Sequence, residues 1–318
     1  MPNKCITESL IQAIESQLKI FSASDSMFAI VKKQLAISTG GLYKNNPPFL
    51  LMLPITVYQA LTGRYKLALP ATASIIYFKS AADIFDDVED EDNPVSLAAI
   101  AGKPIANNIA TAFLILAENT LSNQLGVKNS IKLKIFQCIN HYYANACIGQ
   151  HLDLSLHSRK TLSEVEYFHV TSLKSAIVTE CAARTGALLA ETKQATLECL
   201  TRFGYYLGMV AQINNDLKGI LDDSDLKTKK VTLPWIFALN ESDTASRNIL
   251  KEFLNNSTKP AEIESIKKIL FSCGAIQYSL FKSASYKQLA IESLEKANLN
   301  KIAFNSLSTI LLSNFDEV

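Results

Sequence analysis

The sequence of 318 residues lacks an excess of charge of either sign. Its 31 Lys and Arg residues balance 30 Asp and Glu residues, for a formal net charge of +1. Without a large positive charge there is no general attraction to nucleic-acid phosphates, and we expect no nucleic-acid partner. Disorder is excluded too, because 48% of the residues are hydrophobic and the net charge is small.

Cysteine and long hydrophobic runs are also scarce. The six cysteines are scattered through apolar segments and form no CxxC pair, which argues against a zinc site or a disulfide framework and favours buried free thiols in a reducing compartment. The most apolar windows, Phe49–Leu61 and Ile105–Ala117, are shorter than the ~18 residues of a membrane span. The N-terminal segment lacks the apolar core of a secretory signal. We therefore expect a soluble, cytoplasmic protein without a membrane span.

Strand signals are poor, since the sequence has no sustained alternation and no Asn-Gly or Asp-Gly turn. The helical period is present instead: Leu10, Ile14 and Leu18 share one apolar face. Similar segments span residues 132–156, 170–190 and 197–221, and some are apolar on more than one face, as expected of helices surrounded by others. The sequence predicts an all-α fold, a single domain over residues 1–318, with N-terminal helices in residues 1–39.

The main chemical signal is a run of acidic residues at the end of an apolar helical stretch, where six of the seven residues 86–92 are Asp or Glu. Four aspartates with the spacing i, i+3, i+4 and i+7 share one helix face and repel one another, next to the negative end of the helix dipole. They are Asp83, Asp86, Asp87 and Asp90. Few basic residues lie nearby; Lys79 precedes the run and Lys103 follows it. Mg²⁺, which takes one or two carboxylates together with substrate phosphates, would supply positive charge. The alternative is a solvated acidic loop.

A second polar segment ends another apolar helix. Asn215, Gly219 and Asp223 are spaced i, i+4 and i+8 along one stripe, where Asn and Asp side chains can chelate a cation. Two facing metal sites would clamp a diphosphate between them, and Lys174 and the lysines at 227, 229 and 230 would bind its oxygens as point charges. The alternatives are a helix cap at residues 214–216 and ordinary surface lysines.

These segments resemble the trans-isoprenyl diphosphate synthases (polyprenyl synthetase family) from about residue 40 to the C-terminus. The run Asp86–Asp90 is similar to the first aspartate-rich motif, DDxxD. The remaining matches are Gln150 and Asp153 (QxxD), Lys174-Ser175 (a Lys-Thr pair), Gln212 with Asn215-Asp216 (the second aspartate-rich motif) and Lys230–Pro234 (KxTLP).

The resemblance implies an α-helical barrel of the isoprenoid synthase type, two or three Mg²⁺ ions, an allylic prenyl diphosphate as substrate and a homodimer. It implies the following roles: catalysis by Asp86, Asp87, Asp90 and Lys174; metal binding by Asp86, Asp87, Asp90, Asn215, Asp216 and Asp223; and substrate binding by Lys174, Gln212, Lys229, Lys230, Gln150, Asp153, Phe78 and Ala82. The residues four and five positions before the first motif, Ala82 and Ala81, are small. In this family they imply room for a C15–C20 prenyl chain, capped by Phe78.

Two departures from the family pattern concern the co-substrate. Chain-elongating members bind isopentenyl diphosphate with a GGKRxRP motif, whereas this chain reads GGLYKNNP over residues 40–47 and has no arginine in residues 93–100. A diphosphate needs several charge-assisted contacts, so we expect a different acceptor, a peptide or a small molecule. The segments DIFDDVEDEDN and GQHLDL are most similar to the ComQ-type isoprenyl transferases, which modify a tryptophan of a peptide.

Two alternatives stay open. Residues 215–223 resemble the NDxxSxxxE metal motif of class I terpene synthases, with Gly219 for Ser and Asp223 for Glu, which is compatible with cyclisation of farnesyl or geranylgeranyl diphosphate. The altered second motif is also compatible with a non-catalytic helical binding protein that retains the fold, although the intact first motif argues against it.

Overall fold

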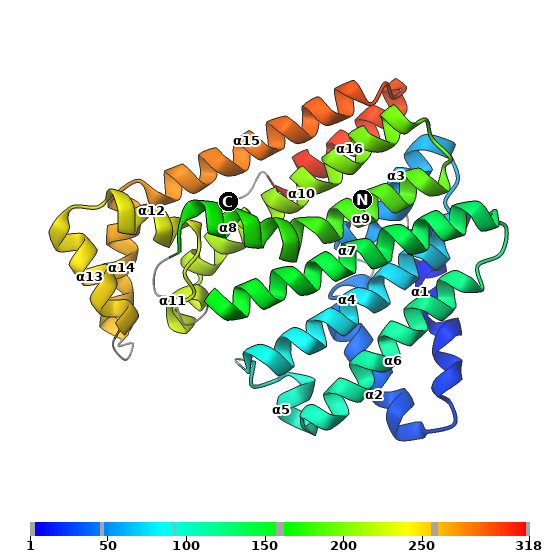
Figure 1. Ribbon diagram of the computed structural model, residues 1–318, viewed down its shortest axis with the longest axis horizontal. Coiled ribbons are helices and arrows are strands. Elements are labelled where there is room, and N and C mark those ends of the chain that lie inside the picture. The colour runs from blue at the N-terminus through cyan, green and yellow to red at the C-terminus, as the bar shows by residue number, and fades with distance from the viewer. Residues whose placement is uncertain (1–3, 45–47, 92, 157–161, 256–259, 316–318) are drawn as a thin grey trace.

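The computed structural model describes residues 4–44, 48–91, 93–156, 162–255 and 260–315. All regular elements within these ranges are helices (Figure 1), so the all-α prediction is confirmed. None of the helices described there is long and apolar enough to cross a membrane. The α-helices are α1 (Lys4–Leu18), α2 (Asp25–Ser38), α3 (Phe49–Thr62), α4 (Leu69–Asp90), α5 (Leu97–Ala101), α6 (Lys103–Ser122), α7 (Asn129–Leu156), α8 (Glu164–Thr171), α9 (Ile177–Leu189), α10 (Gln194–Leu221), α11 (Ser224–Thr228), α12 (Leu233–Glu241), α13 (Thr244–Asn255), α14 (Pro260–Ser272), α15 (Ala275–Lys296) and α16 (Lys301–Asn314).

The predicted helical segments are present, with one difference. The expected N-terminal face is buried in α1, and the segments at 132–156 and 197–221 lie within α7 and α10. The segment at 170–190 is instead interrupted by one π-helical turn, η4 (Ser172–Ala176), between α8 and α9. A π-turn inserts an extra residue into a helix and changes the direction of the side chains around it, which side-chain periodicity alone does not predict.

The long helices α4, α7, α9 and α10 form the body of the molecule. The most extensive packing is between α4 and α6, α10 and α15, and α9 and α10, and α9 also contacts α3 and α7. The C-terminal ends of α4, α7 and α10 point toward the same end of the molecule, at the left of Figure 1. The acidic and polar segments that end α4 and α10 are thereby brought to one end.

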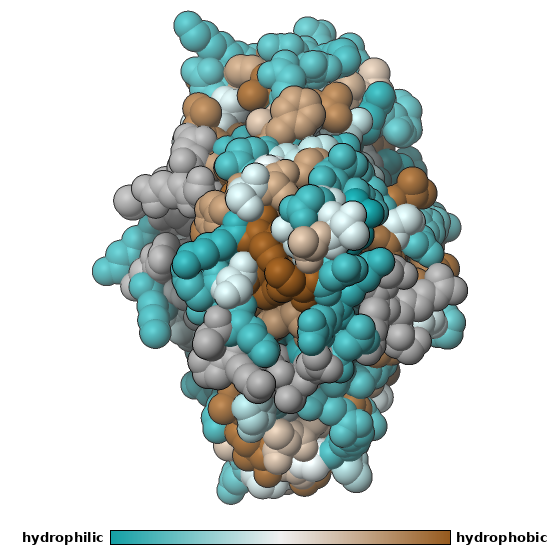
Figure 2. All heavy atoms as spheres, turned by 90° about the vertical axis from the view of Figure 1, so that its left-hand side faces the viewer, coloured by the Kyte–Doolittle hydropathy of each residue, from teal (hydrophilic) through white to brown (hydrophobic). Residues whose placement is uncertain are grey.

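The core consists of two apolar clusters. The larger one combines buried residues of α1 to α4, α6, α7, α9, the first part of α10, the C-terminal part of α15 and α16, and the smaller one lies among α8, the last part of α10, α11 to α14 and the start of α15. Trp235 of α12 is fully buried in the smaller cluster and stacks on Phe253 of α13 with ring centroids 5.8 Å apart. Figure 2 shows the end of the molecule that carries α13 and α14, where apolar side chains at the centre are framed by hydrophilic ones.

The cysteines form no disulfide, as predicted, but they are not all buried. Cys138, Cys181 and Cys199 are buried, whereas Cys5 and Cys147 are exposed and Cys273 is intermediate. The expectation of buried thiols is therefore wrong for Cys5 and Cys147, which lie on outward faces of α1 and α7.

Two glycines let α10 lie directly against the backbone of α9 and η4. A Cβ atom at Gly204 would lie 2.6 Å from the carbonyl oxygen of Thr179, and one at Gly208 would lie 2.6 Å from Cα of Ala176. Real Cβ contacts are not this short, so only glycine permits this approach. The contact fixes the position of the next turn of α10, which carries Gln212.

We predict that Gly204→Ala lowers the free energy of unfolding by about 1–3 kcal/mol, because the added methyl group overpacks a contact with backbone atoms. Urea denaturation measures this change. Lys218→Ala, at an exposed position of the same helix, is the control and should stay within about 0.5 kcal/mol of the parent protein. Equal stability of the two variants would contradict the close approach.

Candidate active site

The last turns of α4 carry the predicted aspartates. The helix ends at Asp90, and Glu91 follows with a left-handed φ of 54°. Lys79 pairs with Asp83 at 2.6 Å, and Lys103 pairs with Glu91 at 2.5 Å. The two nearby lysines therefore neutralise carboxylates at the edges of the run rather than Asp86 or Asp87.

Lys174 lies between carboxylates of two other helices. Its Nζ atom is 3.0 Å from Asp86 Oδ1 on α4 and 2.8 Å from Asp153 Oδ2 on α7. Burial by itself would lower the pKa of Lys174, but the charges of Asp153 and Asp86 outweigh it and raise the pKa to about 12. The ammonium group thus stays protonated at the meeting point of three elements, where a phosphate oxygen would find a positive charge.

The π-turn and a glycine bring Lys174 to this point. A Cβ atom at Gly149 of α7 would lie 2.7 Å from the backbone nitrogen of Lys174, so α7 and η4 touch at their backbones. The next residue, Gln150, has both amide atoms buried, and no described residue forms a hydrogen bond with them. Buried polar atoms without a partner are uncommon and need an explanation, such as an absent water, ion or ligand.

A chain of hydrogen bonds connects η4 to α10. The Ser175 hydroxyl donates to Gln212 Oε1 at 2.8 Å, and Gln212 Nε2 donates to Asp216 Oδ1 at 2.7 Å. The hydroxyl of Tyr167 on α8 donates to Asp216 Oδ2 at 2.5 Å. Asp216 is only 1% exposed. Burial raises its pKa to about 6, although the bonds from Tyr167 and Gln212 and the charge of Lys230 act in the opposite direction. Asp216 is therefore a buried, oriented carboxylate.

Not every predicted residue takes part in this chain of hydrogen bonds. Asn215 is exposed, one residue before Asp216. The Asp223 carboxylate is 2.6 Å from Lys267 Nζ of α14. Lys229 Nζ lies 5.5 Å from the centroid of the Phe253 ring on α13. Asp223 and Lys229 thus interact with the C-terminal helices, and no described contact joins them to Asp216.

The two residues predicted to border the prenyl chain lie on the stripe of α4 below Asp86. Ala82 is exposed one turn before Asp86, and Phe78 is buried one turn further. The Phe78 ring stacks on Tyr143 of α7 with centroids 4.5 Å apart. The eight residues from Asp86 to Phe78 correspond to about 12 Å of helix axis. A small exposed side chain is thus followed by an aromatic pair that closes the space between α4 and α7.

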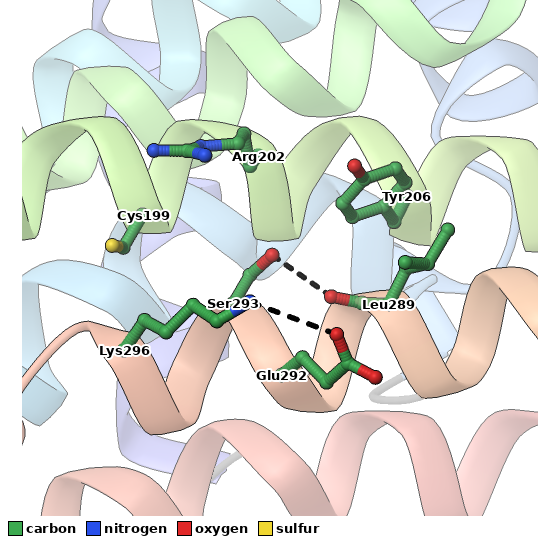
Figure 3. A pocket seen from close by; sticks show the side chains of 7 residues that line it. All are labelled: Cys199, Arg202, Tyr206, Leu289, Glu292, Ser293 and Lys296. Carbon is green, nitrogen blue, oxygen red and sulfur yellow. Dashed lines mark hydrogen bonds and ion pairs between the residues drawn. The ribbon is translucent and has the colours of Figure 1, made fainter.

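Two hollows lie away from these residues. One, of about 60 Å³, lies between α10 and α15 and is lined by Arg202, Tyr206 and Glu292 among others (Figure 3). The other, of about 520 Å³, is formed by residues of α1 and α2, including Ile11 and Phe28. Neither includes a predicted site residue, so neither competes with the end of the bundle as the site.

The residues at this end fit Mg²⁺. The candidate donors Asp86, Asp87, Asp90, Asn215 and Asp216 offer carboxylate and amide oxygens, which hard cations prefer, and the buried Gln150 amide has no hydrogen-bond partner among the described residues. Among the described residues, no three acidic, His or Cys side chains are close enough to hold an ion unaided. That arrangement suits Mg²⁺, which keeps several waters and is completed by substrate phosphates.

Sequence patterns alone did not identify Tyr167 as part of the site. It precedes Lys174 by seven residues, or two helical turns. Because its neighbours in the sequence are mostly apolar, the pattern indicates a core residue rather than a hydrogen-bond donor. The signal that points to it is this spacing from a lysine already assigned to the diphosphate.

The chain matches known proteins over most of its length. The model of the family described as "Polyprenyl synthetase" matches residues 36–270. The tryptophan prenyltransferase ComQ of Bacillus subtilis subsp. natto is 31% identical over 259 residues, which cover 80% of this chain and 78% of the relative.

Solved structures show the same fold. The structure of a geranylgeranyl pyrophosphate synthase superposes with a TM-score of 0.86 at 17% identity and covers 98% of both chains. That of the Corynebacterium glutamicum geranylgeranyl pyrophosphate synthase, complexed with isoprenyl diphosphate and magnesium, has a TM-score of 0.82 at 17% identity, with 99% of this chain and 98% of that chain covered.

We predict that Mg²⁺ and pyrophosphate together raise the melting temperature, while either alone has little effect, because each completes the other's ligands. At a concentration one hundred times the Kd, the stabilisation is about 2.7 kcal/mol. Differential scanning fluorimetry measures it, with pyrophosphate plus EDTA as the control. An unchanged melting temperature with both ligands would contradict the assignment of the site.

Proposed function

The chain belongs to the polyprenyl synthetase family and is an enzyme that acts on allylic diphosphates, and from this premise we propose its acceptor and substrate. We propose that it ionises a C15–C20 allylic prenyl diphosphate with the help of Mg²⁺ and transfers the prenyl group to an acceptor other than isopentenyl diphosphate. The relative named as a tryptophan prenyltransferase supports a peptide tryptophan as acceptor. A small-molecule acceptor is the second possibility. Homodimerisation is a prediction from the resemblance, and a cytoplasmic location is a prediction from the composition of the sequence.

The observation that carries the choice of acceptor concerns residues 40–44. Leu42 stands where the isopentenyl-diphosphate motif has its lysine, and it is fully buried in the larger apolar cluster. Tyr43 stands where that motif has its first arginine, and burial together with the charge of Glu15 raises its pKa to about 12. A buried leucine and a tyrosine do not supply the charge-assisted contacts that a second diphosphate needs. Asn45, Asn46 and Pro47 lie outside the described residues.

In the proposed mechanism, residues of two facing walls hold the diphosphate. Asp86, Asp87 and Asp90 on α4 and Asn215 and Asp216 on α10 are the residues that would hold Mg²⁺, which when bound neutralises charge on the leaving diphosphate. Tyr167 and Gln212 orient the Asp216 carboxylate for this task.

The lysines and the aromatic pair have separate tasks. Lys174 and Lys230 donate N–H groups to phosphate oxygens, and the raised pKa of Lys174 keeps its proton on Nζ throughout. The C–O bond breaks with its electron pair going to the diphosphate, which leaves an allylic cation. The π electrons of the acceptor then form the new C–C bond, and the acceptor loses a proton. Phe78 and Tyr143 present an apolar surface to the prenyl chain and keep water from the allylic cation.

Cyclisation by a class I terpene synthase motif is less well supported. The last residue of that motif would be Asp223, whose carboxylate pairs with Lys267 of α14. A non-catalytic relative is likewise disfavoured, because the curated relatives that the chain matches are named as a prenyltransferase and as geranylgeranyl diphosphate synthases.

The test compares acceptors. We predict that the protein with Mg²⁺ and farnesyl or geranylgeranyl diphosphate modifies a tryptophan-containing peptide, forms no longer diphosphate from isopentenyl diphosphate and releases no cyclic hydrocarbon. Mass spectrometry of the peptide and analysis of the extracted products measure this. Elongation with isopentenyl diphosphate would refute the proposed acceptor, and a terpene formed without any acceptor would favour cyclisation.

In the same assay, Asp87→Ala should lower the rate by several orders of magnitude, whereas Glu89→Ala should stay close to the parent rate. Both changes remove one carboxylate from the same segment, but Glu89 is exposed and lies outside the face shared by the four aspartates. Circular dichroism would show that both variants fold. Equal activities would contradict the metal assignment.

We also predict that Phe78→Ala shifts the preference toward longer prenyl diphosphates, because it removes one ring of the pair that closes the space below Ala82. The ratio of kcat/KM values for geranylgeranyl and farnesyl diphosphate measures this shift. Phe281→Ala, which removes a ring that is 66% exposed on α15, should leave the ratio unchanged. An unchanged ratio in Phe78→Ala would mean that the prenyl chain of the substrate does not lie against Phe78.

A further inference from the structure

We propose that Asp225 of α11 supplies the carboxylate that the second aspartate-rich segment lacks at Gly219, and so completes the Mg²⁺–diphosphate site from outside α10. The inference rests on the proposed function, since it concerns the same site. It assigns a metal-binding role to a residue outside the recognised motif.

The geometry at Gly219 carries the proposal. A Cβ atom built on Gly219 would lie 2.4 Å from Oδ2 and 2.6 Å from Oδ1 of Asp225. The carboxylate thus occupies the position where a side chain at 219 would start. Gly219 is one turn beyond Asn215 and lies on the same face of α10 as Gln212 and Asp216. A carboxylate at this place extends the row of polar groups that Gln212 begins.

The chain is folded to hold Asp225 there. Asp223 and Lys229, which flank α11, have left-handed φ values of 67° and 58°, so the short helix turns back onto α10. The backbone N–H of Lys230 donates to the carbonyl oxygen of Asp225 at 2.9 Å. Lys267 binds both Asp223 Oδ1 at 2.6 Å and the carbonyl oxygen of Leu221 at 2.8 Å. The pair that removes Asp223 from the site therefore stabilises the turn that presents Asp225.

The surroundings of the carboxylate suit a cation. Asp225 is half-buried, and among the described residues no group donates a hydrogen bond to its side chain. Burial raises its pKa, and the charge of Lys230 opposes this. The charge of Lys230 acts to lower the pKa of both Asp216 and Asp225, so these two carboxylates lie near the same lysine. Two carboxylates near one lysine leave an excess negative charge, which a divalent ion would neutralise.

The experiment measures Mn²⁺ binding, as a paramagnetic substitute for Mg²⁺, to the full chain in the presence of inorganic pyrophosphate, by electron paramagnetic resonance. We expect Asp225→Asn to weaken Mn²⁺ binding about 10–100-fold, the range found when a group that supports a metal site is removed. Asp25→Asn is the matched control, because it makes the same change at an exposed position of α2, away from the site. It should bind Mn²⁺ like the parent chain.

Two further variants test the position rather than the charge. Gly219→Ala is favourable for a helix, so the fold should persist, but its methyl group must displace the Asp225 carboxylate and should weaken Mn²⁺ binding to a similar extent. The double variant Gly219→Asp, Asp225→Ala returns a carboxylate to the face of α10 and should recover most of the affinity.

Parent-like binding by Asp225→Asn would overturn the inference, as would full affinity in Gly219→Ala. Either result would leave the proposed function intact, because the parent chain would still bind both ligands. Failure of the parent chain itself to bind Mn²⁺ and pyrophosphate would overturn the proposed function as well as this inference.

Discussion

Repulsion between carboxylates at the ends of neighbouring helices is the constraint on which the rest of this structure depends. Asp86 on α4, Asp153 on α7 and Asp216 on α10 lie near helix C-termini, where the backbone dipole is already unfavourable for anions. Lys174 offsets part of this charge by contacting the first two. A divalent cation would offset more of the negative charge at these helix ends.

Close backbone contacts make that arrangement possible. The glycines at 149, 204 and 208 let η4 and the two helices beside it approach until backbone atoms touch. Short side chains and hydrogen bonds then span the remaining distances, as in the chain from Ser175 through Gln212 to Asp216. The same residues that pack the middle of the bundle therefore position the polar groups at its end.

Much of this could be predicted from sequence, because helical periodicity and the spacing of Asp86, Asp87 and Asp90 are local properties. Which carboxylates pair with lysines on distant helices is not local, so the pairing of Asp223 with Lys267 could not be anticipated. The π-turn at η4 and the contact between Gly219 and Asp225 were also beyond reach, since both depend on how segments meet in three dimensions. Tyr167 was missed because its ring looks like ordinary core material.

The π-turn makes the helix that runs from α8 to α9 sensitive to its exact length. The π-turn holds one residue more than a regular α-turn, so deleting one residue within Ser172–Ala176 would restore regular winding and change the directions in which Lys174 and Ser175 project. Lys174 would then no longer contact both Asp86 and Asp153, and Ser175 would no longer donate to Gln212. We therefore expect this segment to tolerate substitution better than deletion. Natural variation in its length would change which side chains reach the site.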